Sequence, residues 1–539
     1  MKLLLKASLL VIALPLWAET IPLSDYSSQN SSVTVHSLET KGHTLHTVKF
    51  NLNKLNAISH STHPKFKVLS EKNISFSQSV GESRLPFKSV VVAGTPDEIE
   101  VTVDPKRSLE VSILSSPAQP EDCRCETNKQ KPWVPLKIDH KNSLYEVEFL
   151  GKFRGQALSR VTFYAAKTNL KNQTTTFYPE LEAQIRSSQS LSTLYSNKQY
   201  SEYDYLIVTP EALLSGLSDF VQYKMDHGLK VKVITLEEVG TSVSTITDFF
   251  KNEYQVAQYK YALIVGTDTL FPNHKVDTSG SSKTPSDYPY FLMDDQDMIP
   301  DVQYGRIVAS TSQEVERQTK KWINYQNHGS ISSQYLKMIG IASNEGESPS
   351  DDEYVTGIEK DLSKAFGTVS THFYQSDATS RPSFINEAFN NGTGYLVYLG
   401  HGSGTSWAST GSYYTTSHIP QMNNANVLQP VIIDVACQNG ILKKGFLGET
   451  FMNAVNNDGN AIGAAMYYGG SVNISWHPPA IMARGMVKQV IAQKLTTVGD
   501  ALLSGHLYLM ENYTDIESVR DNFEWYHLFG DPSSSVYFN

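Results

Sequence analysis

The sequence predicts an α/β protein with a mostly parallel sheet sandwiched by helices, preceded by a β-rich, sandwich-like domain. The first observation is the length of 539 residues, which exceeds one ordinary domain. The second is a change of pattern near residue 200, where alternating apolar and polar runs give way to continuous apolar runs separated by helical patterns. Alternation is typical of half-buried strands, and continuous runs are typical of strands buried on both faces.

The first 18 residues are expected to be a secretory signal peptide. Lys2 and Lys6 precede an apolar stretch, and cleavage is expected after Ala18. This stretch is short and contains Pro15, and no later segment has the roughly 20 apolar residues that span a bilayer. We therefore expect a secreted or periplasmic protein with no membrane span after signal removal.

Residues 19–199 are expected to form the β-rich domain. Its predicted strands lie in SVTVHSL, SVVVAGTPDEIEVTVD, SLEVSIL and LYEVEFLG. The polar, serine-rich segment at about 186–203 is expected to be a linker, in which Arg186 and Lys198 are basic sites for cleavage.

Residues 200–539 are expected to form the α/β part, with a first subdomain at 200–330 and a second at 331–539. Buried strands are predicted at 205–210, 229–236, 261–266, 335–343, 394–400, 431–437 and 461–469. Helices are predicted at 211–228 and 312–329. The net charge of −10, without a long charged run, argues against nucleic acid as a partner.

Three polar residues follow predicted strands in the second subdomain: Glu345, His401 and Cys437. In open parallel sheets, functional residues gather at the carboxyl ends of the strands. If the strands before His401 and Cys437 are neighbours, the two side chains face one substrate and offer a thiolate nucleophile with a histidine proton donor. Glu345 would hold the imidazole in one tautomer, and the backbone N–H groups of Gly402 and Cys437 would meet a developing oxyanion.

Other kinds of site make different demands on the sequence around these residues. A phosphatase loop of the Cys-x5-Arg type needs arginine where Lys443 stands, and a nucleophile elbow around Ser403 needs glycine where His401 stands. The spacing of His and Cys does not match a zinc site. An inert buried thiol remains the commoner role of a lone cysteine. Cys123 and Cys125 are left open between a strained disulfide and two reduced thiols.

The blocks YLGHGS and IIDVACQNG resemble the signature of the gingipain-type cysteine peptidases, family C25, which are relatives of the caspases and legumain. The likeness continues through IASNEG, GRI, SVNISW and HLFGDPS and covers roughly residues 203–539. The region LPFKSVVVAGTPDEIEVTV is similar to the family's amino-terminal propeptide. The resemblance implies a caspase-like fold and a secreted cysteine endopeptidase made as a zymogen. It also implies protein and peptide substrates, a basic P1 residue (Arg or Lys), and inhibition by the chain's own propeptide.

Site residues follow from the resemblance position by position. His401 and Cys437 match the catalytic dyad, Glu345 the acidic residue that supports the histidine, and Gly402 the oxyanion-hole glycine. Trp476 matches an aromatic residue that packs on the P1 side chain, with Ser475 beside it. A plain core tryptophan is the alternative.

Two regions depart from the family pattern. The loop that carries the specificity aspartate of the Arg-specific members has a different length here, so Asp351, Asp352 and Glu353 compete for that role. Asp352 and Glu353 are assigned to the pocket, against the alternative of a solvated acidic loop that caps the next helix. Gly404 stands where those members have glutamate.

The family's catalytic domains bind calcium, which suggests a structural metal site in MDDQDMIPD. Its candidate oxygen ligands are Asp294, Asp295, Asp297 and Asp301. An acidic turn that binds no ion is the alternative, and no cofactor is expected for the chemistry itself. Two other functions stay open: a peptidase-like binding protein without turnover, and a transpeptidase or acyltransferase that uses the same thiol.

Overall fold

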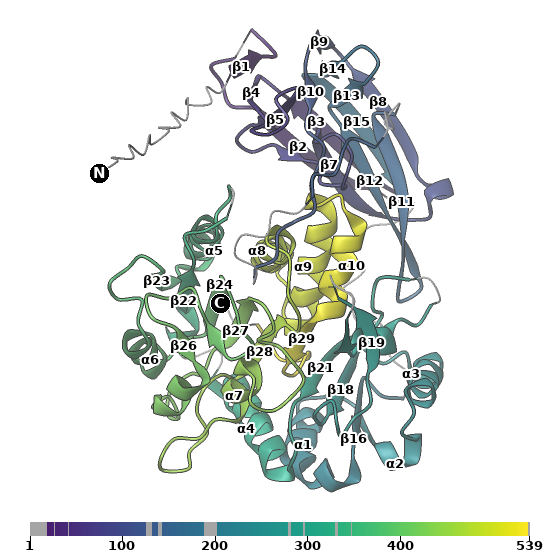
Figure 1. Cartoon of the computed structure of the whole chain (residues 1–539). Helices are drawn as coiled ribbons and strands as arrows, with labels where there is room; N and C mark the ends of the chain where they lie inside the picture. Colours follow the sequence, from purple (N-terminus) through teal and green to yellow (C-terminus); the bar gives the residue numbers. More distant parts are fainter. Residues whose placement is uncertain are drawn as a thin grey trace, which may run out of the picture.

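The computed structural model in Figure 1 describes residues 19–25, 27–40, 43–124, 132–137, 143–187, 202–278, 282–294, 297–328, 333–346 and 348–536. The predicted signal peptide, Cys125, Lys198 and Asp295 lie outside these residues. The β-rich domain occupies the top of the view, and the two α/β sheets lie below it. Within the described residues, no helix is long and apolar enough to cross a bilayer.

The N-terminal domain consists of four small sheets in which neighbouring strands are antiparallel, except β5 and β10. Two sheets have the orders β1 (Glu19–Pro22), β4 (Lys54–Ser59), β5 (Phe66–Ser70), β10 (Leu114–Ser115) and β11 (Tyr145–Phe153), β12 (Gln156–Tyr164), β7 (Pro86–Ala93), β6 (Ser75–Phe76). The others are β13 (Ala166–Asn169), β14 (Thr174–Phe177), β9 (Leu109–Val111) and β2 (Ser32–Thr40), β3 (His43–Asn51), β15 (Glu180–Ser187), β8 (Glu100–Pro105). Burial alternates along β3 and β15, as the sequence pattern predicts.

The first α/β sheet is entirely parallel. Its order is β17 (Val231–Thr235), β16 (Tyr205–Thr209), β18 (Tyr261–Val265), β21 (Gln303–Ile307). Its helices are α1 (Ser218–Asp226), α2 (Leu236–Val239), α3 (Val243–Ala257) and α4 (Ser312–His328). The helix predicted at 211–228 begins with a 3₁₀ segment, Glu211–Leu217, before α1.

The second sheet positions the candidate site. Its order is β23 (Val369–Tyr374), β22 (Lys337–Ala342), β24 (Tyr395–Leu399), β27 (Val431–Val435), β28 (Met466–Gly470), β29 (Tyr526–Phe529), and only β29 is antiparallel to its neighbour. Its helices are α5 (Asp351–Phe366), α6 (Pro382–Asn390), α7 (Leu447–Asn453), α8 (His477–Gln493), α9 (Val498–Asn512) and α10 (Ile516–Trp525). Short pairs are β19 (His274–Asp277) with β20 (Lys283–Ser286) and β25 (Ser406–Trp407) with β26 (Tyr414–Thr415). The predicted fold class is confirmed.

The predicted boundary between the domains differs from the structure at its start. Strand β15 continues to Ser187 and pairs with β3 on one side and β8 on the other. Arg186 therefore belongs to a strand, where its side chain lies 3.9 Å from that of Glu100, and it is not in a linker. The alternation of ELEAQIRS carries the strand into the polar segment, and the next strand begins at Tyr205.

The N-terminal domain docks on the second α/β unit through the end of α9. Arg160 of β12 donates hydrogen bonds to the carbonyls of Met510, Tyr513 and Thr514, at 3.3, 2.9 and 3.2 Å. These carbonyls carry the negative end of the helix dipole, which favours a cation there. The β7 amide of Val91 donates to Glu511 at 3.1 Å. These contacts fix the domain at the end of α9.

Candidate active site

Glu345, His401 and Cys437 lie at one edge of the second sheet, because they follow the neighbouring strands β22, β24 and β27. The register pairs Leu399 with Ala342 on one side and with Val435 on the other, so the three strands end at the same level. The predicted adjacency of the strands before His401 and Cys437 is confirmed. Each strand is shorter than its apolar run, and His401 and Cys437 lie just beyond the last paired residues.

The imidazole of His401 is held by groups on several sides. Its Nε2 lies 3.1 Å from Oε2 of Glu345, whose side chain is 45% exposed. The indole of Trp476 meets the ring edge-to-face, with centroids 5.4 Å apart. The backbone is fixed as well, since the His401 N–H donates to Oγ of Ser409 at 2.9 Å and the hydroxyl of Tyr398 donates to the His401 carbonyl at 2.6 Å. These contacts orient the ring toward the sheet edge.

Cys437 is a free cysteine and is completely buried. Burial raises the pKa of its thiol to about 12, against the opposing effects of the Ile474 amide and the Arg124 cation. A thiol with so high a pKa is almost entirely protonated near neutral pH, and the thiolate is the nucleophilic form. Burial of the site therefore disfavours the thiolate form of Cys437.

Gly402 packs directly on the backbone of Cys437. A Cβ at this position would lie 2.5 Å from the carbonyl oxygen of Cys437 and 2.8 Å from its nitrogen. Any side chain would clash with this backbone. Glycine is thus required for the close approach of the two chain segments that follow β24 and β27.

The site is covered by Glu121–Arg124 of the N-terminal domain, which we name the inhibitory segment after the role proposed for it below. Arg124 is completely buried, and its guanidinium Nη1 lies 2.8 Å from Oδ2 of Asp351. Its Nε and Nη2 donate to the carbonyl of Trp476 at 3.1 and 2.6 Å, and the guanidinium lies 4.6 Å from the centroid of a Trp476 ring. The pocket thus satisfies the arginine by charge, hydrogen bonds and a π face.

The backbone of the inhibitory segment runs antiparallel to residues 474–477. The Arg124 N–H donates to the Ile474 carbonyl at 3.1 Å, and Cys123 forms an isolated antiparallel bridge with Ser475. The Arg124 carbonyl contacts Nδ1 of His401. Cys123 is disulfide-bonded, and its Sγ lies 3.9 Å from Sγ of Cys437. The carbonyl of the buried arginine therefore faces the histidine, and the sulfur of the preceding residue, Cys123, lies beside the Cys437 thiol.

The structure places only Asp351 of the three acidic candidates against Arg124. Asp351 is completely buried and also accepts a hydrogen bond from the Ser343 hydroxyl at 2.7 Å. The carboxylate of Asp352 accepts from the Ser350 hydroxyl, and that of Glu353 accepts from the Ser350 N–H at 2.9 Å. Asp352 and Glu353 therefore cap the start of α5, as in the alternative reading of this loop.

Sequence reasoning missed Arg124. A usable signal was present, because the propeptide-like region contains an arginine flanked by two cysteines in EDCRC. A basic residue in such a compact segment is a candidate mimic of a basic P1 residue. Its partner Asp351 lies 227 positions further along the chain.

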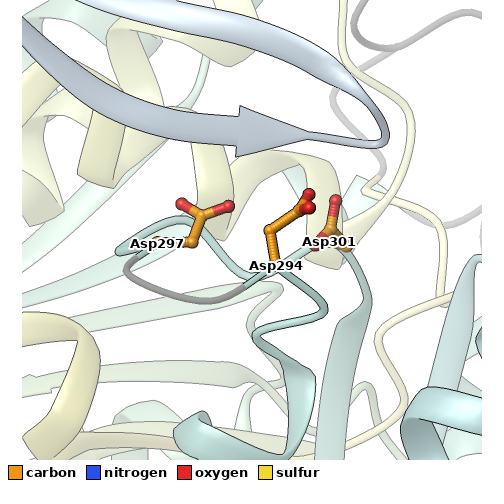
Figure 2. Close-up of side chains that lie close together, drawn as sticks. All are labelled: Asp294, Asp297 and Asp301. Atoms are coloured by element: carbon orange, nitrogen blue, oxygen red, sulfur yellow. The ribbon is translucent and has the colours of Figure 1, made fainter.

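Three of the four candidate metal ligands lie together (Figure 2). One ligand oxygen from each of Asp294, Asp297 and Asp301 falls within 4.8 Å of the others. Burial, partly offset by backbone hydrogen bonds, raises the pKa of Asp297 to about 6 and that of Asp301 to about 7. The turn between β11 and β12 covers the group, with the Lys152 N–H donating to Asp297 at 3.0 Å and the Arg154 N–H donating to Asp301 at 2.5 Å.

Comparison with known proteins gives matches in sequence and in structure. The family model described as Peptidase family C25 matches residues 198–537. Gingipain R2 of Porphyromonas gingivalis is 27% identical over 386 residues, which cover 68% of this chain and 50% of the relative. Gingipain R1 from the same organism is 26% identical over 512 residues, covering 85% of this chain and 50% of the relative. The chain thus spans about half the length of these curated relatives.

Solved structures match over a similar region. The crystal structure of the Arg specific cysteine proteinase gingipain R superposes with a TM-score of 0.57 at 26% identity, covering 64% of this chain and 80% of the other. A complex of the Porphyromonas gingivalis RgpB pro- and mature domains gives a TM-score of 0.55 at 27% identity, covering 61% and 79%. The family match at residues 198–537 includes both α/β sheets.

Proposed function

Because the chain belongs to peptidase family C25, we propose that it is a cysteine endopeptidase that cleaves after arginine and is made as a latent precursor. The observation that carries the proposal is Arg124, whose guanidinium is paired with Asp351 while its carbonyl contacts His401. A P1 arginine of a substrate would need the same two contacts. The similarity to a proteinase described as Arg specific supports the same preference.

In the proposed reaction, the Cys437 thiolate attacks the carbonyl carbon of the P1 arginine. The C–N bond breaks as His401 gives a proton to the leaving amine, and water then hydrolyses the thioester. Glu345, 3.1 Å from Nε2 of His401, stabilises the imidazolium. The N–H groups of Gly402 and Cys437 are assigned to the oxyanion. Trp476 and Asp351 hold the P1 side chain, and Ser475 pairs with the substrate backbone.

The test is a library of acyl peptides that differ only at P1, assayed with protein that has been cut within residues 188–201 by an exogenous protease. We expect cleavage after arginine, with lysine slower, because only the planar guanidinium can satisfy Asp351 and the Trp476 carbonyl together. An arginyl chloromethyl ketone should label Cys437. Equal cleavage after unrelated P1 residues, or absence of both cleavage and labelling, would refute the proposal.

Residues 19–187 are proposed to keep the enzyme latent by acting as an inhibitory prodomain. The domain is anchored at α9 by Arg160, and its inhibitory segment fills the P1 pocket and buries the thiol. The similarity to a complex of pro- and mature domains supports this role. Cleavage in the segment between Ser187 and Tyr205 would free the prodomain to leave.

Replacing Arg124 by alanine should weaken this latency in the uncut chain. The substitution removes the ion pair with Asp351 and two hydrogen bonds to Trp476, so the inhibitory segment should leave the site more often and expose Cys437. We expect faster alkylation of Cys437 by iodoacetamide and a rise of about 10-fold or more in initial arginyl peptidase activity. Arg107→Ala, an exposed arginine of the same domain, is the matched control. An unchanged alkylation rate in Arg124→Ala would contradict the role of Arg124.

We propose that residues 1–18 direct export of the protein, because Lys2 and Lys6 are followed by an apolar stretch, as in a signal peptide. The processed protein would then function outside the cytoplasm. Amino-terminal sequencing of protein recovered outside the cells should begin at Glu19 for the latent form. Retention of Met1 would refute the signal peptide.

A structural calcium ion is proposed at Asp294, Asp297 and Asp301. The donor set fits, since calcium prefers carboxylate oxygens and three of them converge from one loop. Burial raises the pKa of Asp297 and of Asp301, and a divalent cation would offset the cost of ionising these buried carboxyl groups. Bound calcium would tie together the ends of this loop; it takes no part in the proposed chemistry.

Calcium should raise the melting temperature of the full chain more at pH 8 than at pH 5. The raised pKa values mean that the folded state binds more protons than the unfolded state between about pH 4 and 7, so unfolding free energy falls as pH rises through this window. Calcium offsets this loss only where the carboxylates are ionised. Asp297→Asn should reduce the calcium effect, and the exposed Asp248→Asn should leave it unchanged. A calcium effect that is equal at both pH values would contradict the assignment.

A further inference from the structure

We propose that the enzyme has an S4 subsite that binds an acidic side chain, formed by the Tyr513 hydroxyl and the first N–H of α8. The inference deepens the proposed function and rests on it, because it treats the inhibitory segment as a substrate stand-in. With Arg124 in the P1 position, Glu121 stands at P4. The ligand class is therefore a peptide with glutamate three residues before the arginine.

The register of the inhibitory segment supports this alignment. Arg124 pairs with Ile474, and Cys123 lies opposite Ser475 in the antiparallel bridge. Continuing that pairing places Glu121 opposite His477, the first residue of α8. The contact between the Glu121 carboxylate and the His477 N–H is present at 3.4 Å. The antiparallel register set at Arg124 and Cys123 thus brings the side chain of Glu121 to the start of α8, and the same register would position the matching residues of a peptide substrate.

The Glu121 carboxylate is bound by two donors. The Tyr513 hydroxyl donates to Oε1 at 2.8 Å, and the His477 N–H approaches Oε2. Tyr513 is only 2% exposed, and burial together with the Glu121 charge raises its pKa, so the hydroxyl stays protonated as a donor. A hydrogen bond from a buried neutral donor to a carboxylate is stronger than one to a neutral amide oxygen. The subsite therefore distinguishes glutamate from glutamine.

The start of α8 explains why its N–H is available. The first N–H groups of a helix have no partner within the helix, and Pro478 and Pro479, which follow His477, have no N–H at all. The His477 N–H is thus the first donor at the positive end of a 17-residue helix. An anion is favoured at this end by the helix dipole.

Both donors belong to the part of the chain that would remain after processing. Tyr513 follows α9 and His477 begins α8, and both lie within the region that matches the family model. Two other charges act on the Tyr513 hydroxyl: Arg84, which belongs to the prodomain and would leave with it, and Asp515, which would remain. Asp515 opposes an acidic P4 residue, and the two donors must outweigh it.

The experiment uses two peptides, acyl-Glu-Ala-Ala-Arg and acyl-Gln-Ala-Ala-Arg with distinguishable reporters, mixed in one tube with the cut enzyme. The ratio of their initial rates equals the ratio of their kcat/KM values and does not depend on the amount of active enzyme. We expect the Glu peptide to be cleaved about five- to tenfold faster, because a charged acceptor makes the stronger hydrogen bond. In Tyr513→Phe the ratio should fall to about twofold or less.

Tyr508→Phe is the matched control, because it removes a phenolic hydroxyl from α9 that makes no contact with Glu121. Its Glu-to-Gln ratio should equal that of the wild type. Equal cleavage of both peptides by the wild type, or a Tyr513→Phe ratio as high as the wild-type one, would overturn the subsite. Failure to cleave either peptide after arginine would instead contradict the proposed function.

Discussion

Replacing Cys437 by alanine should reduce arginyl peptide hydrolysis to the background rate, a loss of at least about 10⁵-fold in kcat. The Cys437 sulfur lies 3.9 Å from the sulfur of Cys123, the residue before Arg124, and Cys437 is free of any disulfide. No covalent intermediate can form without its sulfur. The measurement is kcat/KM on the arginyl peptide after the chain is cut within residues 188–201.

The fold should survive this substitution. Alanine removes one buried sulfur atom, and the change affects neither strand β27 nor the contact of Gly402 with the Cys437 backbone. Circular dichroism and the melting temperature are the control measurements. Activity above about 1% of wild type in a folded Cys437→Ala protein would mean that another group is the nucleophile.

The arrangement of the site along the sheet was predictable from local pattern. Continuous apolar runs before His401 and Cys437 indicate buried parallel strands, and parallel strands end at one edge. The lengths of the apolar runs overestimate the lengths of the strands; β27, for example, ends at Val435. The reason is that apolar residues remain buried after the chain leaves the sheet. The fold class therefore follows from periodicity, whereas the adjacency of the strands before His401 and Cys437 was a condition of the argument that the structure supplies.

The pocket that holds Arg124 was not predictable in the same way. Asp351, Asp352 and Glu353 are adjacent acidic residues in the first turn of α5, and successive helix positions point in directions about 100° apart. The position at which α5 begins decides which of the three side chains points to Arg124, and in the structure it is that of Asp351. Helix starts are poorly fixed by sequence, and Arg124 belongs to a separate domain, 227 positions before Asp351, so local pattern does not predict their contact.

Replacing Asp351 by asparagine should lower kcat/KM for arginyl peptides by about 10²- to 10⁴-fold. Asparagine preserves the volume and can still accept the Ser343 hydroxyl, so the substitution removes little except the negative charge. A substrate arginine would then be buried without a counterion, and breaking a buried ion pair in this way costs about 3–5 kcal/mol. The loss should be far smaller for a peptide with neutral citrulline at P1.

The two acidic residues next to Asp351 supply the discriminating control. Asp352→Asn should keep near wild-type kcat/KM, since its carboxylate contacts Ser350 at the start of α5 and not Arg124. A loss in Asp352→Asn as large as in Asp351→Asn would show that diffuse negative charge, and not the single buried ion pair, selects the substrate. Asp351→Asn alone should make kcat/KM equal for the peptides with arginine and with citrulline at P1. One carboxylate, fixed in the first turn of α5, then accounts for both P1 selection and retention of Arg124 in the latent chain.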